Sequence, residues 1–297
     1  MDDSTIAALR TACAAVFDIG LATMLGALAT PGLMHDATSA WAARRVRRCR
    51  RLFLHAGVVA LLGQFAWLAV QSVAMADTPG DSVLATAWGL VTDTRFGQAW
   101  VIATAAVAGG TALSALRVLR PASPLALGLA IVIAAAAHAA TGHAGANGID
   151  WQLPTMAVHL LAIGLWAGGV IVGALAVLRG EVDAVDGARY AARLSRLATV
   201  ALVGVAVTGA ASAWHGLGGT LAPLAVVDAS SWATVLDAKL VLVAAAIVLG
   251  AINRFAVLPR LPHAWLRFAR VLRVEAVVMV LILVAAAMLA NGEPPAM

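Results

Sequence analysis

Residues 141–169 read TGHAGANGIDWQLPTMAVHLLAIGLWAGG, and this stretch decides the fold. A short polar segment rich in glycine precedes a long apolar run, which is typical of a loop that leads into a membrane helix. His143 lies just past the preceding apolar run, and His159 lies about two turns into the following one. Polar side chains in a bilayer are costly and usually functional. Two imidazoles at one end of a helix bundle therefore indicate a bound metal or cofactor.

The rest of the chain repeats this apolar character. Of its 297 residues 62% are hydrophobic and 12% are charged, about half the charge of an average soluble domain. The apolar runs are continuous, which favours membrane helices over the alternating strands of a barrel. The formal net charge is +5, but the basic residues lie in short loops, where they set membrane topology. We therefore expect a polytopic membrane protein in the lipid bilayer, with no nucleic-acid partner.

A membrane span needs about 20 apolar residues. The sequence predicts an all-α bundle, one transmembrane domain over residues 1–297, with eight spans at about 5–30, 52–76, 98–119, 124–142, 152–178, 194–215, 233–257 and 268–290. Arginines cluster in alternate loops, and of the 20 basic residues only Arg10, Arg95 and Lys239 fall towards the other side. The positive-inside rule then predicts cytoplasmic arginine-rich loops and both termini outside.

Five residues near the outer ends of the spans are candidate metal ligands: His143, His159, His138, Met156 and His215. Met156 and His159 are three residues apart and share a helix face. Imidazole and thioether together suit Cu(I) better than Zn(II) or haem iron. A simpler interpretation stays open for His138 and His215, because a histidine at a helix end often only hydrogen-bonds water. Met156 is also a common packing residue.

Charged residues inside the spans indicate a transport path. Asp18 lies in the middle of the first span, while Asp237 and Lys239 lie in the outer third of the seventh. Lys239 is expected to pair with Asp18 or Asp237, or to hold a negative group of a cofactor; the alternative is that it snorkels to the interface. Glu275 is expected to be a structural partner of Arg254 or Arg273. The chain has no Walker loop, C-x-x-C or H-E-x-x-H motif, so neither a nucleotide-driven pump nor a soluble type of enzyme is expected.

Several segments follow one another in the order and spacing of a known family. They are GHA at 142–144, HLLAIGLWAGG at 159–169, TDTRFGQAW at 92–100, RLSRLA at 193–198 with Thr208-Gly209, LDAKL at 236–240 with Asn253-Arg254, and RVE at 273–275. From about residue 92 to its end the chain resembles the copper resistance protein D (CopD) family; the first two helices resemble it only in character. The sequence departs from the family pattern at 101–104, where an arginine is frequent, and at 231–234.

The resemblance implies a bacterial inner-membrane protein that passes copper inwards from the periplasm, with His143 and His159 as its copper contacts. On this hypothesis the chain is a transporter and not an enzyme. Copper passes Asp18 and leaves near His35 or His55, and a periplasmic copper chaperone is a candidate donor. The alternative is a haem b redox protein with bis-histidine ligation, because the family also resembles a membrane protoporphyrinogen oxidase family that uses haem. Against haem, His143 and His159 lie close to the surface.

Overall fold

The computed structural model describes residues 2–76, 82–116, 123–142, 151–216, 231–261 and 263–292, and these ranges contain helices and no strands. Seven helices among them are long and apolar enough to cross a membrane. They are α1 (Asp3–Leu33), α2 (Ala40–Met75), α4 (Arg95–Leu116), α7 (Gln152–Val172), α8 (Ala184–Gly216), α9 (Ser231–Ala251) and α10 (Trp265–Asn291). A π-helical turn, η1 (Gly173–Val177), extends α7, and η3 (Ile252–Val257, π) and η4 (Leu258–Arg260, 3-10) extend α9.

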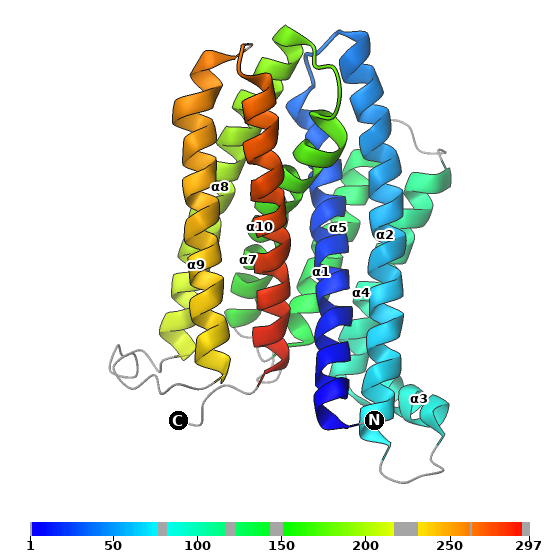
Figure 1. The fold of residues 1–297 in the computed structure, drawn as a ribbon. Helices are drawn as coiled ribbons and strands as arrows, with labels where there is room; N and C mark the ends of the chain where they lie inside the picture. Colours follow the sequence, from blue (N-terminus) through cyan, green and yellow to red (C-terminus); the bar gives the residue numbers. More distant parts are fainter. Residues whose placement is uncertain are drawn as a thin grey trace.

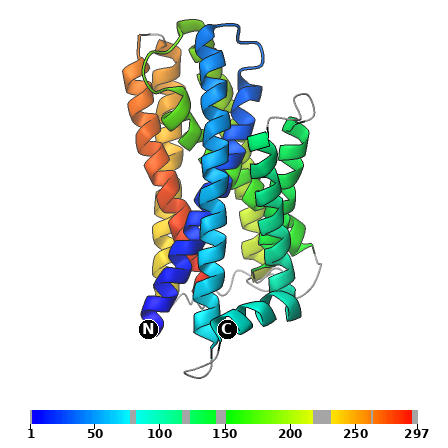
Figure 2. The ribbon, with the colours of Figure 1, turned by 90° about the vertical axis from the view of Figure 1, so that its right-hand side faces the viewer.

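Two shorter helices accompany the long ones. α3 (Val83–Asp93) lies across the end of the bundle where α1 begins, and α5 (Ser123–Ala140) stands beside α4 (Figures 1 and 2). The all-α expectation is confirmed, and seven of the eight expected spans correspond to the long helices. The remaining expected span, 124–142, corresponds to α5, whose 18 residues are close to the minimum for crossing a bilayer.

α2 begins well before the apolar span predicted at 52–76. The hydroxyl of Ser39 accepts a hydrogen bond from the backbone nitrogen of Ala42 at 3.2 Å, so Ser39 caps the helix there. The arginine cluster at 44–51 therefore forms helical turns that continue the span without a break.

α1 is the helix around which the others pack. It contacts α2, α7, α10 and α5 (Figure 1). Its contact with α7 is made through glycines. A Cβ atom added to Gly26 would lie 2.2 Å from the Gly168 backbone, and one added to Gly168 would lie 1.8 Å from the carbonyl oxygen of Ala22. Small residues let two backbones touch, and such contacts drive helix association in lipid.

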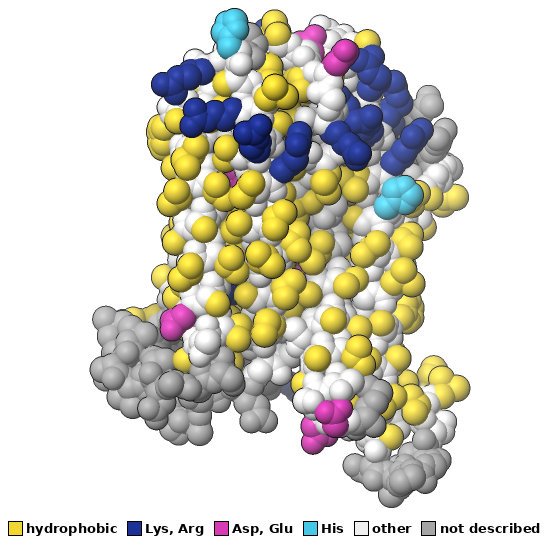
Figure 3. All heavy atoms as spheres, in the orientation of Figure 1, with side chains coloured by type: hydrophobic (Ala, Val, Ile, Leu, Met, Phe, Trp, Pro, Cys, Tyr) yellow, Lys and Arg dark blue, Asp and Glu magenta, His cyan; other side chains and the backbone are white. Residues whose placement is uncertain are grey.

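The two ends of the bundle differ in charge. On the face drawn in Figure 3, lysine and arginine side chains form a band near one end and an apolar surface covers the middle. α1 begins and α10 ends at the opposite end (Figure 1). This segregation agrees with the clustering of arginines in alternate loops.

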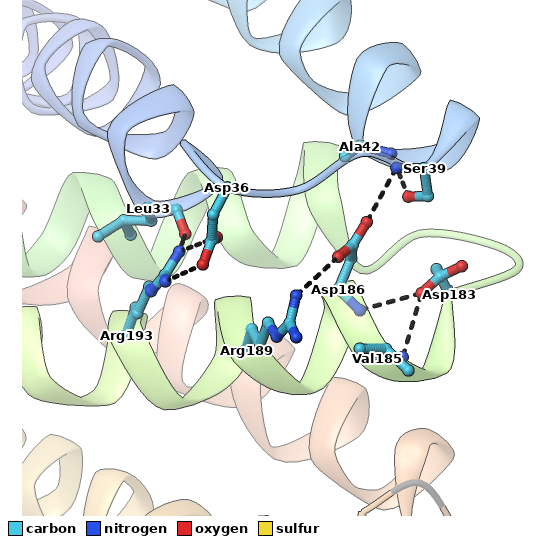
Figure 4. Close-up of polar contacts among 9 residues, drawn as sticks. All are labelled: Leu33, Asp36, Ser39, Ala42, Asp183, Val185, Asp186, Arg189 and Arg193. Carbon is cyan, nitrogen blue, oxygen red and sulfur yellow. Dashed lines mark hydrogen bonds and ion pairs between the residues drawn. The ribbon is translucent and has the colours of Figure 1, made fainter.

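Polar contacts join the loops at the arginine-rich end (Figure 4). Arg193 of α8 donates to both carboxylate oxygens of Asp36, at 2.6 and 2.7 Å, and to the carbonyl oxygen of Leu33 at 3.0 Å. These hydrogen bonds, with the positive charge of Arg193, lower the pKa of Asp36 to about 2. The backbone nitrogen of Ser39 donates to Asp186 at 3.1 Å. The loop between α1 and α2 is thereby tied to α8.

Arg45 makes a second connection at this end. Its side chain is buried and donates to the carbonyl oxygens of Arg179 and Glu181 at 2.9 and 2.8 Å. Trp41 donates to the Glu181 carbonyl at 3.1 Å. α2 thus holds the segment that follows α7, because the side chains satisfy carbonyl groups that no helix pairs.

Candidate metal site and transport path

His159 is the predicted ligand whose surroundings the structure defines best. It lies on α7, and its Nδ1 atom is 2.8 Å from the Oγ1 atom of Thr208 on α8. A Cβ atom added to Gly209 would lie 3.6 Å from the ring, so a glycine leaves space for the imidazole there. His159 and Thr208 each lie about 10–12 Å along their helices from the end of the bundle opposite the arginine-rich band. His159 therefore lies inside the bundle and below its surface.

The hydrogen bonds of Thr208 favour one tautomer of His159. The Thr208 hydroxyl donates to the carbonyl oxygen of Gly204 at 2.6 Å, the usual bond of a threonine inside a helix. With its proton used there, Thr208 accepts the Nδ1–H of His159. The Nε2 atom of the neutral ring then carries a free lone pair. Metal-binding histidines commonly have this arrangement, in which one ring nitrogen donates to a protein group and the other binds the metal.

Asp18 and His138 lie within hydrogen-bonding distance of each other inside the bundle. The Nε2 atom of His138 on α5 is 3.0 Å from a carboxylate oxygen of Asp18 on α1, and the two side chains are 22% and 18% exposed. The Phe17 ring packs against the imidazole with centroids 4.6 Å apart. The structure thus joins a predicted ligand to a predicted path residue. Binding of a metal by His138 stays a prediction, and in this geometry the Nε2 atom is occupied.

Lys239 of α9 is partly buried and lies in the same half of the bundle. It interacts electrostatically with the carboxylate of Asp18 and with the His159 ring. Asp237 is exposed, and no ion pair between Lys239 and Asp237 is present among the described residues. Of the two partners expected for Lys239, the structure therefore favours Asp18. Asp18 thus contacts His138 and interacts with Lys239.

The other predicted ligands are less defined. Met156 is partly buried one turn before His159 and makes no polar contact. His143 lies outside the described residues, as does the side chain of His215 at the end of α8. The described residues contain no group of three or more His, Cys, Asp or Glu side chains able to hold a metal. The pairing of His143 with His159 therefore stays a prediction.

Two further expectations concern the arginine-rich half. Glu275 does not pair with an arginine among the described residues. Its carboxyl group faces Asn253, while Arg254 donates to Thr199 of α8 at 2.7 Å. The expected pairing with Arg254 or Arg273 was wrong, because Arg254 is directed towards α8 and Arg273 is exposed on α10. His55, named as an exit for copper, is exposed on α2.

Sequence reasoning missed Thr208 as a contact of His159. The Thr208-Gly209 pair was noticed only as part of a resemblance. A threonine within an apolar helix is ordinary, and 49 residues separate it from His159. The only local signal was the adjacent glycine, which gives a neighbouring side chain space.

Comparison with known families covers most of the chain. Residues 1–153 match the family model described as Copper resistance protein D-like, N-terminal domain, and residues 188–289 match Copper resistance protein D. The first match includes the first two helices, whose sequence resembles the family only in character. His159 and the glycines of α7 lie between the matched ranges. No curated protein and no solved structure matches the chain. On these matches the chain is a multi-pass membrane protein that belongs to the copper resistance protein D family.

Proposed function

We propose that the protein carries copper across the bacterial inner membrane, from the periplasm to the cytoplasm. One observation supports this more than any other: His159 lies inside the bundle with its Nδ1 atom bound to Thr208, and its Nε2 atom has no hydrogen bond to a described residue. An unprotonated imidazole nitrogen is a good ligand for copper. The family match favours copper over the haem alternative.

The proposal includes an orientation. By the positive-inside rule, the arginine-rich end faces the cytoplasm and both termini face the periplasm. α5 then counts as an eighth span, since a helix of 18 residues can cross the hydrocarbon core. His159 and the Asp18–His138 pair lie in the periplasmic half, where a metal would be received.

In the proposed site, His159 and His143 bind copper, and His138, Met156 and His215 contribute ligands. A carrier must release its cargo, so a site with few ligands suits transport. Cu(I) is favoured over Cu(II) because the set combines imidazole with thioether. Copper is the cargo here and not a resident cofactor.

The proposed path continues along α1. Asp18 supplies the negative charge that attracts a cation, with His138 and Lys239 balancing that charge when no metal is present. Asp237, which is exposed on α9, is proposed to lie near the periplasmic entrance. Charged groups inside a membrane bundle commonly mark ion pathways.

Uptake into proteoliposomes loaded with a Cu(I) chelator tests the proposal. We expect Cu(I) uptake by the wild type, loss of uptake in His159→Ala, and about 10-fold weaker copper binding in Thr208→Val, since removal of a partner of a metal-binding histidine costs about 10- to 100-fold in affinity. Thr199→Val, on the same helix but bonded to Arg254, is the matched control. Undiminished uptake by His159→Ala would reject the site. A haem absorption band in the purified protein would reject copper transport.

A further inference from the structure

A cavity of about 330 Å³ lies in the arginine-rich half of the bundle, between α8 and α9. α8 packs on α7 and α9 packs on α10, but α8 and α9 make little direct contact. The walls of the cavity are mainly apolar, with Leu194, Leu202, Ile247, Phe268 and Leu272 among them. Its volume falls within the range of small-molecule sites, and it is distinct from the surroundings of His159.

The cavity has a polar patch in its wall. Glu275 of α10 and Asn253 of η3 line it and are only 3% and 6% exposed. The amide nitrogen and oxygen of Asn253 have no hydrogen-bond partner of normal geometry among the described residues, although the Glu275 carboxyl lies beside them. A Cβ atom added to Gly250 would lie 3.5 Å from Glu275 Oε1, so the glycine keeps the carboxyl group accessible from the cavity.

Two neighbouring polar residues of η3 face different helices. Asn253 faces Glu275 on α10, whereas Arg254 bonds the side chain and backbone of Ser195 and the hydroxyl of Thr199 on α8. Short π-helical segments inside helices occur frequently at functional sites. Arg254 therefore spans from η3 to α8 at the edge of the cavity, and no described residue forms an ion pair with Glu275.

Within the described part of the chain, Glu275 makes no ion pair. Arg254 and Glu275 are the only ionisable side chains among the lining residues. α7 contributes Trp166 and Val170 to this region and α8 contributes neutral residues. The half of α1 at this level, residues 19–33, has no ionisable side chain, and Arg273 on α10 is exposed. A buried carboxylate without a partner is strongly destabilised, so such a group takes up a proton or a cation.

We propose that Glu275 and Asn253 form a proton-binding site that exchanges through the cavity between α8 and α9. The proton binds to a carboxylate oxygen of Glu275 and gives a neutral carboxylic acid, which donates a hydrogen bond to the amide oxygen of Asn253. The amide nitrogen donates to water in the cavity. The existence of this site is independent of copper. Its use as the ion that drives transport rests on the proposed function.

Infrared difference spectroscopy of the purified protein tests the proton site without copper. We expect the carbonyl band of a protonated carboxylic acid near neutral pH, a shift of that band in D₂O through exchange, and loss of one such band in Glu275→Gln. Glu181→Gln, an exposed glutamate in the loop before α8, is the matched control and keeps the band. If no protonated band is present, or if Glu275→Gln leaves the spectrum unchanged, the proposal is overturned.

A second variant covers the case in which Glu275→Gln does not fold. Asn253→Leu removes the acceptor of the carboxylic acid and is expected to shift the band, and an unshifted band overturns the proposed pairing. Copper uptake under an imposed pH gradient then tests the use of the site. Uptake that responds to the gradient in the wild type but not in Glu275→Gln supports coupling. An intact band with no copper uptake in the wild type rejects the transport function and leaves the proton site supported.

Discussion

The contact between α1 and α7 and the gap between α8 and α9 are opposite solutions to packing helices in lipid. At the first, Gly26 and Gly168 bring two backbones together with no space for a methyl group. At the second, two helices lie apart around a cavity of about 330 Å³. Each pair also includes a polar residue of a proposed site: Asp18 lies on α1, and Asn253 lies in η3, which extends α9.

The difference separates a closely packed part of the bundle, at α1 and α7, from a loosely packed part, at α8 and α9. Without a hydrophobic driving force between helices, association in lipid depends on close van der Waals contact. α1 and α7 are in such van der Waals contact at Gly26 and Gly168. α2 also packs closely on α1 through small residues. α8 and α9 are held mainly by α7 and α10 and by Arg254. A ligand can enter between them with little disturbance of the core.

The largest expected loss of stability comes from disrupting the close contact between α1 and α7. Gly168→Ala places a methyl group 1.8 Å from the Ala22 carbonyl oxygen, so α1 and α7 must separate. Overpacking of this kind costs about 3 kcal/mol or more of unfolding free energy when backbone must move. Thermal unfolding in detergent measures the loss. Gly109→Ala is the control, since nothing lies within 4 Å of its added Cβ. Equal melting temperatures for the two variants would contradict the rigid contact.

A smaller loss is expected from Arg45→Ala, which frees the segment after α7 from α2. The carbonyl oxygen of Arg179 loses its donor, and that of Glu181 keeps only Trp41; the loss of hydrogen bonds from a charged group costs about 1.5–3 kcal/mol. Arg44→Ala removes a neighbouring exposed arginine and is expected to change stability by less than about 0.5 kcal/mol. The same thermal unfolding assay measures both variants. A loss of stability of equal size in Arg45→Ala and Arg44→Ala would show that the charge, and not the carbonyl contacts, stabilises this end.

A small gain in stability, and not a loss, is expected for a substitution at the cavity between α8 and α9. Gly250→Ala adds a methyl group at an ordinary contact distance from Glu275 Oε1. The cavity accepts it, and alanine is favoured over glycine in a helix by up to about 1 kcal/mol. We expect a slightly higher melting temperature than in the wild type. Destabilisation comparable to that of Gly168→Ala would mean that the two regions are packed alike.

The smallest effect concerns the tie between the α1–α2 loop and α8. The pKa of Asp36 is lowered from 3.8 to about 2 by hydrogen bonds and charge from Arg193. A carboxyl group with a lowered folded pKa adds stability above its unfolded pKa and loses it as the pH falls through the folded value. The stability difference between wild type and Asp36→Asn is therefore expected to stay constant from neutral pH to about 3.8 and to vanish towards about 2. A difference that persists at the lowest pH would rule out the ionised pair as its source.

The spans were predictable because each depends on local composition. A run of about 20 apolar residues shields its own backbone in lipid whatever its neighbours are. The position of His159 two turns into α7 follows from the same reasoning. Its bond to Thr208, the pairing of His138 with Asp18, and the separation of Glu275 from Arg254 depend on which helices adjoin, and hydrophobicity alone carries no such information. The start of α2 was misplaced because charged helical turns continue an apolar span without an apolar signal.

The sequence by itself determined that this is a helical membrane protein, which end of the bundle carries the arginines, and which imidazoles lie at depth, since these follow from counting apolar and charged residues along one chain. Only the tertiary structure decided which polar groups meet. Helix rotation and adjacency are set by close contacts such as Gly26 with Gly168, between segments far apart in the chain, and by local π-helical turns that redirect side chains. The contact of His159 with Thr208 and that of Glu275 with Asn253 exist only in that arrangement.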